Sequence, residues 1–184
     1  MGNPWLTIPL GDYEGHMAMP DVGQAKMLAK EFEGLLSALT PSSVALIGCA
    51  GGNGFEEATK AGVARLIGLD INPTYIAHAK ARYAGRMTGL ELYCADIENE
   101  TPEFRPVDLV YAALVFEYVD IARALKNLRA ICLPGGVMAA LLQLPKQGAE
   151  NVSPSPFVTL KELSSIMRLV PPEEFRTVAE GLGF

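Results

Sequence analysis

Short apolar runs alternate with stretches of helical spacing from residue 44 onward. Continuous apolar runs of this length predict buried strands, and they fall at residues 44–47, 64–69, 90–95, 107–113 and 137–144. Between them, helices are predicted over residues 55–61, from Pro73 to about Gly85, and after the capping residue Asp120. This alternation predicts an α/β fold: a doubly wound, mostly parallel sheet with helices on both faces.

The flanking segments complete one domain. Apolar residues recur at helical spacing between Ala25 and Leu39, and Asp21 with Gln24 predicts a capping box for that helix. Residues 5–19 are aromatic and ionisable but show neither the helical nor the strand spacing of apolar residues. This predicts an irregular N-terminal lid segment over residues 1–21. Two short helices are predicted over residues 160–168 and 173–182. We expect a single domain over residues 22–184.

Composition excludes several classes of protein. With 15 Lys and Arg against 21 Asp and Glu, the net charge is −6, which argues against a nucleic-acid partner and against an anionic membrane surface. The hydrophobic share of 49% is too high for a disordered chain. The longest apolar run is interrupted by Asp108 and Glu117 and is too short to span a bilayer. Three scattered cysteines and the absence of a leader pattern predict a reducing, cytoplasmic location.

Candidate ligand-binding residues follow the first three predicted strands. Ligands of open parallel sheets bind outside the carboxyl ends of the strands, where residues 48–54 form a loop with four glycines. Asp70 ends the second strand, where a carboxylate can accept hydrogen bonds from both hydroxyls of a ribose. Asp96 ends the third strand and is placed to accept from an adenine amine. Each feature also has a purely structural alternative: a tight turn for the loop, a helix cap for Asp70 and an Asx turn for Asp96.

Two nucleoside-binding patterns compete for the glycine-rich loop. The dinucleotide pattern G-x-G-x-x-G matches poorly, because Ala50 and Asn53 occupy its second and third glycine positions. This disfavours a nicotinamide dehydrogenase. Four other motifs occur in order: Gly48-Cys49-Ala50-Gly51-Gly52, Gly68-Leu69-Asp70-Ile71, Ala95-Asp96-Ile97 and Leu133-Pro134-Gly135-Gly136. Together they resemble the class I S-adenosylmethionine-dependent methyltransferases over residues 22–184.

The resemblance implies that the cofactor is S-adenosyl-L-methionine, and it assigns cofactor-binding roles to ten positions. In chain order these are Gly48, Cys49, Ala50 and Gly52 under the methionyl part, Asp70 at the ribose, Ile71 with Asp96 and Ile97 around the adenine, and Ala112 and Ala113 beside the transferable methyl group. It also implies seven strands, of which the sequence supplies five.

Catalytic groups are less well defined. Methyl transfer from a sulfonium depends largely on proximity, orientation and exclusion of water, so a general base is needed only for a protonated nucleophile. The candidates are Tyr13, His16, Glu117 and Tyr118. A surface position is the alternative for His16, and a solvated or helix-capping position is the alternative for Glu117. No cluster of ligating residues indicates a metal.

Two departures from the family pattern leave an alternative open. Leu46 stands where the family often has an acidic residue, and Ala50 replaces the middle glycine. A catalytically inert module that binds S-adenosylmethionine or S-adenosylhomocysteine is therefore the alternative to an active methyltransferase. The sequence Tyr111-Ala112-Ala113-Leu114 lacks the Asn-Pro-Pro-Tyr pattern of enzymes that methylate amides or base amines, so we expect a small-molecule methyl acceptor.

The fifth predicted strand, residues 137–144, would lie next to an open sheet edge. Its apolar sequence contains no charge or proline that would discourage pairing with another strand. We therefore expect either that the 184 residues are a fragment of a longer, C-terminally truncated domain, or that two chains form a homodimer through the exposed edge.

Overall fold

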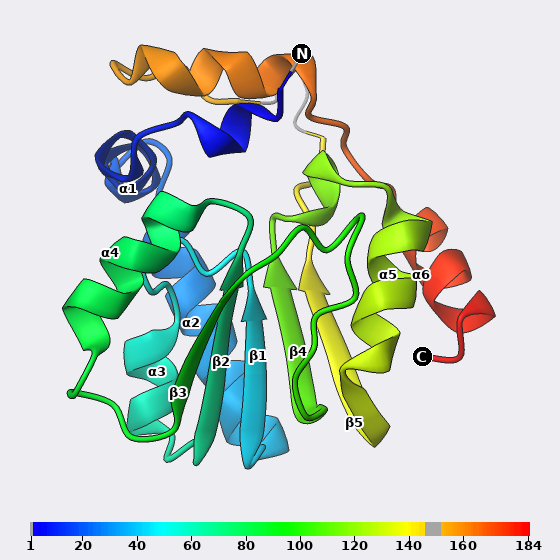
Figure 1. Cartoon of the computed structure of the whole chain (residues 1–184). Coiled ribbons are helices and arrows are strands. Elements are labelled where there is room, and N and C mark those ends of the chain that lie inside the picture. The colour runs from blue at the N-terminus through cyan, green and yellow to red at the C-terminus, as the bar shows by residue number, and fades with distance from the viewer. Residues whose placement is uncertain (1, 146–151) are drawn as a thin grey trace.

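The computed structural model describes residues 2–145 and 152–184 (Figure 1). Its elements are η1 (Pro4–Leu6), α1 (Leu10–Ala18), α2 (Gln24–Leu39), β1 (Ser43–Ile47), α3 (Phe55–Lys60), β2 (Arg65–Asp70), α4 (Pro73–Tyr83), β3 (Leu90–Cys94), β4 (Val107–Ala113), η2 (Phe116–Tyr118), α5 (Ile121–Ala130), β5 (Cys132–Leu141), η3 (Val158–Ser165) and α6 (Pro172–Gly181). The η elements are 3₁₀ helices.

The five strands form one sheet in the order β3-β2-β1-β4-β5, and every neighbouring pair is parallel. This confirms the predicted doubly wound fold. The chain order reverses between β1 and β4, so the loops after these strands diverge and leave room for a ligand. All carboxyl ends point toward η1, α1 and η3, which lie above the sheet in Figure 1.

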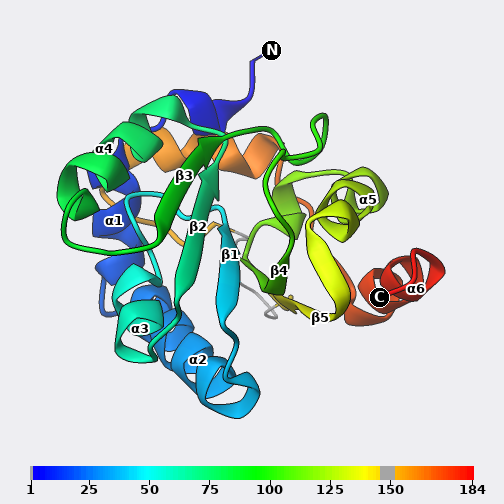
Figure 2. The same cartoon turned by 60° about the horizontal axis from the view of Figure 1, so that its bottom comes forward.

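Helices cover both faces of the sheet, as Figure 2 shows from a second direction. On one face, Phe32 of α2, Phe55 of α3 and Ala79 of α4 belong to one buried cluster. On the other, Leu125 of α5 packs with the strands, and α6 contributes Phe175 at the margin of that second cluster. Because the central strands are buried on both faces, they consist of nearly continuous apolar runs.

The first helices differ from the prediction. Residues 10–18 form α1 rather than an irregular segment, although Gly11 and Gly15 each lower helix propensity. Burial of Leu10 and Met17 stabilises this helix through tertiary contacts instead. The predicted capping role of Asp21 is also wrong, because α2 begins after Gly23, which adopts φ 64° and serves as the N-cap residue.

The last strand begins earlier than predicted. β5 starts at Cys132 and ends at Leu141, and the expected turn at residues 133–136 lies inside it as a bulge. Cys132 pairs with Val107 while Val137 pairs with Leu109, so the intervening residues loop out between the two. Within the described residues no strand pairs beyond β5. The fragment and the homodimer therefore stay predictions.

Candidate active site

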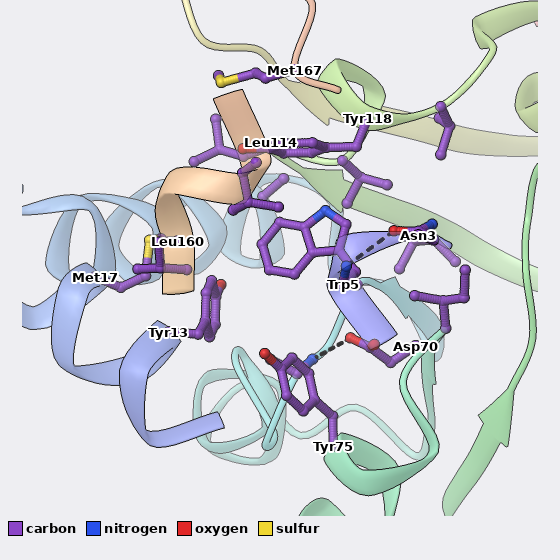
Figure 3. Close-up of a pocket in the computed structure, with 18 of the residues that line it drawn as sticks. Asn3, Trp5, Tyr13, Met17, Asp70, Tyr75, Leu114, Tyr118, Leu160 and Met167 are labelled. Carbon is purple, nitrogen blue, oxygen red and sulfur yellow. Dashed lines mark hydrogen bonds between the residues drawn. The ribbon is translucent and has the colours of Figure 1, made fainter. Parts of the chain in front are cut away.

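A cavity opens at the carboxyl ends of β1, β2, β3 and β4. Its floor consists of residues that end the strands or follow them, in four short groups: Ile47, Gly48 and Ala50; Leu69, Asp70 and Ile71; Ala95, Asp96 and Ile97; and Ala113, Leu114 and Val115. Its roof comes from the N-terminal segment and from η3, which bring Trp5, Tyr13 and Leu160 over the strand ends (Figure 3). The cavity therefore lies at the switch point between β1 and β4.

Asp70 is the buried carboxylate of this cavity and is 7% exposed. Its Oδ2 accepts a hydrogen bond from the Ala50 N–H at 2.8 Å, and its Oδ1 accepts one from the Asn72 N–H at 2.9 Å. Burial raises the pKa of Asp70, and these two hydrogen bonds act against that shift. Each carboxylate oxygen keeps further acceptor capacity, so Asp70 is placed to accept two vicinal hydroxyls of a ligand.

The glycine-rich loop passes under the cavity in a conformation that side chains disfavour. Gly48 has φ 70° and Gly52 has φ 114°, and Ala50 also takes a positive φ of 47°. A Cβ atom at residue 48 would lie 2.8 Å from Cγ2 of Val115, which would fill the space between the loop and the segment after β4. A backbone cradle next to a buried carboxylate fits a nucleoside with a polar tail.

Seven of the ten predicted cofactor residues line the cavity: Gly48, Ala50, Asp70, Ile71, Asp96, Ile97 and Ala113. Their contacts with a ligand stay predictions. Three do not line it. Ala112 is fully buried in the core beneath α5, because neighbouring strand residues point to opposite faces. Cys49 packs in the cluster on the α2 face, and a Cβ at Gly52 would lie 2.3 Å from the Tyr83 ring.

The N-terminal segment reaches the middle of the cavity through Trp5. In Figure 3 the indole lies between Leu114 and Tyr118 on one side and Asp70 and Tyr75 on the other. Its ring meets Tyr118 edge to face at a centroid distance of 5.1 Å. The Trp5 carbonyl accepts a hydrogen bond of 2.8 Å from the Asn72 side chain. The chain is thus fixed where it crosses the end of β2.

Helix α1 rests directly on the glycine-rich loop. Leu10 packs with Ala50, and the Asn53 side chain donates to the Tyr13 hydroxyl at 3.0 Å. Glu14 forms a two-pronged ion pair with Arg82 of α4. Because this pair is partly exposed, apolar packing rather than the ion pair provides most of the attachment. The predicted lid is therefore a packed helical element that covers the cavity.

Three of the four catalytic candidates line the cavity, namely Tyr13, His16 and Tyr118. Burial raises the pKa of both tyrosines, which keeps them neutral. His16 is 7% exposed, so its alternative as a surface residue is wrong. Its Nδ1 has no hydrogen-bond partner within the described part of the chain, and burial lowers its pKa. A neutral imidazole therefore borders the cavity.

Glu117 is not among the described residues that line the cavity. It is 1% exposed and accepts a hydrogen bond of 2.6 Å from the Gln143 N–H, just after β5. Its own carbonyl accepts from the Arg168 N–H at 2.8 Å. Glu117 is therefore neither solvated nor a helix cap, so the alternative inferred from the sequence is wrong. Glu117 joins the segment after β4 to two later parts of the chain.

The buried carboxyl of Glu117 has a testable effect on stability. Burial raises its pKa, so above its ordinary pKa the folded state binds more protons than the unfolded state. Stability then falls as the pH rises through the folded pKa. We expect Glu117→Gln to flatten the loss of stability as the pH rises above the ordinary glutamate pKa of about 4.3, measured by urea unfolding at each pH. Exposed Glu180→Gln is the control and should keep the wild-type slope; a Glu117→Gln profile parallel to wild type would contradict the assignment.

Several cavity residues were not predicted from the sequence. They come from the N-terminal segment, from α2 and from the region around η3: Asn3, Trp5, Met17, Gln24, Leu160, Leu163 and Met167. One signal was available, because Tyr13, His16 and Met17 have the i, i+3, i+4 spacing of one helix face. The remaining residues meet only through tertiary contacts between distant parts of the chain.

The chain folds as a doubly wound α/β protein, and a cavity with a buried carboxylate lies at its switch point. The family model described as a methyltransferase domain matches residues 46–140, which is more than half of the chain. The chain therefore belongs to the class I S-adenosylmethionine-dependent methyltransferase family.

Two curated relatives are similar to part of the chain. Trans-aconitate 2-methyltransferase of Methylobacterium radiotolerans is 37% identical over 106 residues, covering 56% of this chain and 38% of the relative. Ubiquinone biosynthesis O-methyltransferase of Rhodopseudomonas palustris is 37% identical over 93 residues, covering 50% of this chain and 36% of the relative. Among solved structures, N-methyltransferase NodS of Bradyrhizobium japonicum in complex with S-adenosyl-L-homocysteine has a TM-score of 0.66 at 20% identity, covering 98% of this chain and 86% of that one. The curated matches thus span well under half of each relative.

Within the described residues, no helix combines the length and the apolar character that crossing a membrane requires.

Proposed function

We infer that the chain binds S-adenosyl-L-methionine and transfers its methyl group to a small-molecule acceptor. The observation with the most weight is the Asp70 carboxylate, buried at the end of β2 and hydrogen-bonded to the glycine-rich loop. The family match supports the identity of the ligand. The names of the two curated relatives support a small-molecule acceptor.

In this proposal each part of the cavity has one task. Asp70 accepts the ribose hydroxyls, Ile71 with Asp96 and Ile97 encloses the adenine, and the backbone at Gly48 and Ala50 carries the methionyl part. Cys49 and Gly52 shape the loop from outside the cavity. When bound, the cofactor supplies an electrophilic methyl group. The protein orients the acceptor against it and excludes water, which accounts for much of the rate enhancement in such displacements.

Calorimetry with S-adenosylhomocysteine, S-adenosylmethionine and NAD tests the binding step, and mass spectrometry of acceptor mixtures tests transfer. We expect both S-adenosyl compounds to bind and NAD not to bind. Binding without transfer to any acceptor would identify the inert module instead. Binding of NAD alone would contradict the proposal.

A further inference from the structure

The part of the cavity beyond Trp5, seen from Asp70, is apolar and aromatic. In Figure 3, Leu114, Tyr118 and Met167 lie on the far side of the Trp5 indole. Trp5 meets Tyr13 and Tyr118 edge to face, with interplanar angles of 77° and 89°. Flat aromatic molecules pack favourably against rings in this arrangement. We call this part of the cavity, formed by Trp5, Tyr13, Leu114, Tyr118, Leu160 and Met167, the acceptor chamber.

The charges around the cavity disfavour an anionic acceptor. Among its described lining residues there is no lysine or arginine, and the charged residues are Asp70 and Asp96. A carboxylate or phosphate entering this cavity would lose its hydration without gaining a cationic side chain of the protein as a partner. The uncharged polar side chains include Gln24 and Gln143, whose Nε2 and Oε1 atoms lie 3.5 Å apart. An acceptor that is neutral and mostly apolar matches this lining.

His16 supplies a group that can take up a proton. It lines the cavity on the same helix as Tyr13, and its Nδ1 is buried without a hydrogen-bond partner in the described structure. Leaving a buried nitrogen without a partner is unfavourable, and the hydroxyl of an acceptor can provide the missing partner. The lowered pKa of His16 keeps the ring neutral at neutral pH, as a proton acceptor must be.

We propose that the acceptor is an uncharged aromatic hydroxyl compound of the phenol or catechol type, and that His16 acts as the general base for its methylation; this rests on the function proposed above. The acceptor oxygen forms a bond to the methyl carbon as the bond from that carbon to the sulfonium sulfur breaks. The electron pair of the broken bond stays on sulfur and neutralises it. The hydroxyl proton passes to His16, so the products are the methyl ether, S-adenosylhomocysteine and a protonated imidazole.

The test uses the whole chain and three classes of probe: catechol with 4-nitrocatechol, citrate, and benzylamine. Methyl transfer from S-adenosylmethionine is followed by mass spectrometry, and S-adenosylhomocysteine affinity is measured in parallel. The variants are His16→Asn, which cannot act as a base, and His78→Asn as the matched control. His78 is the chain's other histidine and is exposed on α4.

We expect transfer to the catechols but not to citrate or benzylamine. His16→Asn should lower kcat on catechol about 100-fold or more and leave S-adenosylhomocysteine affinity unchanged, while His78→Asn should match wild type. The loss should be much smaller on 4-nitrocatechol, whose nitro group acidifies the hydroxyl so that little proton removal is needed. If the role of His16 were purely structural, His16→Asn would reduce kcat on catechol and kcat on 4-nitrocatechol equally.

Three outcomes overturn the inference: binding of S-adenosylhomocysteine without transfer to any catechol, transfer to citrate or benzylamine in place of the catechols, or equal effects of His16→Asn on both catechols. Failure to bind S-adenosylhomocysteine would instead refute the proposed function itself, so the two failures are distinguishable.

Discussion

Replacement of Asp70 by alanine is expected to weaken the binding of S-adenosylhomocysteine at least tenfold. A hydrogen bond to a charged acceptor contributes about 1.5–3 kcal/mol, and losing one such bond to a ribose hydroxyl corresponds to a roughly 10- to 150-fold increase in Kd. The measurement is calorimetric titration of the Asp70→Ala and Asp70→Asn variants. Asp70→Asn should show the smaller loss, because its amide oxygen remains an acceptor.

The same carboxylate also supports the fold, so the experiment needs a control for stability. Asp70→Ala leaves the N–H groups of Ala50 and Asn72 without their acceptor, which will lower stability as well. Asp108 is a matched control, because its Oδ2 accepts from both the N–H and the hydroxyl of Ser43 and it does not line the cavity. Asp108→Ala should destabilise the protein without changing Kd. An unchanged Kd in Asp70→Ala would show that the end of β2 does not bind the ribose.

The strands could be predicted from the sequence because each central strand is buried on both faces. β4 has the predicted bounds Val107–Ala113, and β1, β2 and β3 lie within about a residue of theirs. β5 was misplaced because the bulge at residues 133–136 resembles a turn in the sequence while the pairing continues around it. Local pattern identifies burial and turns, but register depends on the neighbouring strand.

The floor of the site was predictable for the same reason, whereas its roof was not. Asp70 ends β2 and Asp96 lies just after β3, so the sheet topology places both at the cavity. Ala112 does not line the cavity, because two adjacent strand residues point to opposite faces and only Ala113 faces the cavity. Trp5 reaches the site through a hydrogen bond to a residue 67 positions away, a contact that no local pattern contains.

Glu117 shows a second limit of local reasoning. A charge within an apolar run predicts exposure, because ionised carboxylates are seldom fully buried without a partner. Here the partner is the Gln143 N–H, which the pairing of β5 with β4 places next to Glu117. Burial of the Glu117 side chain is therefore compensated by a hydrogen bond that only the tertiary structure provides.

Closure of the N-terminal lid is expected to depend on Gly15. A Cβ at this position would lie 2.3 Å from Cζ of Phe157, and Phe157 packs on the buried cluster of Ile8, Leu160 and Leu163. Moving the ring aside would loosen its packing on that cluster, so we expect Gly15→Ala to shift Phe157, α1 or both and to weaken the contact between α1 and η3. Overpacking of this kind costs about 1–3 kcal/mol. If ligand retention requires the closed lid, S-adenosylhomocysteine affinity falls about 5- to 150-fold.

Gly11→Ala is the matched control on the same helix. Gly11 is exposed and no heavy atom lies within 4 Å of a Cβ built there, so this change should raise stability by up to about 1 kcal/mol and leave affinity intact. Deletion of residues 1–19 is expected to abolish turnover, but it also uncovers Leu160 and Leu163, which makes the glycine pair the cleaner comparison. The measurement is the dissociation rate of S-adenosylhomocysteine for both variants. Equal rates in Gly15→Ala and Gly11→Ala would mean that ligand retention does not depend on how α1 packs against η3.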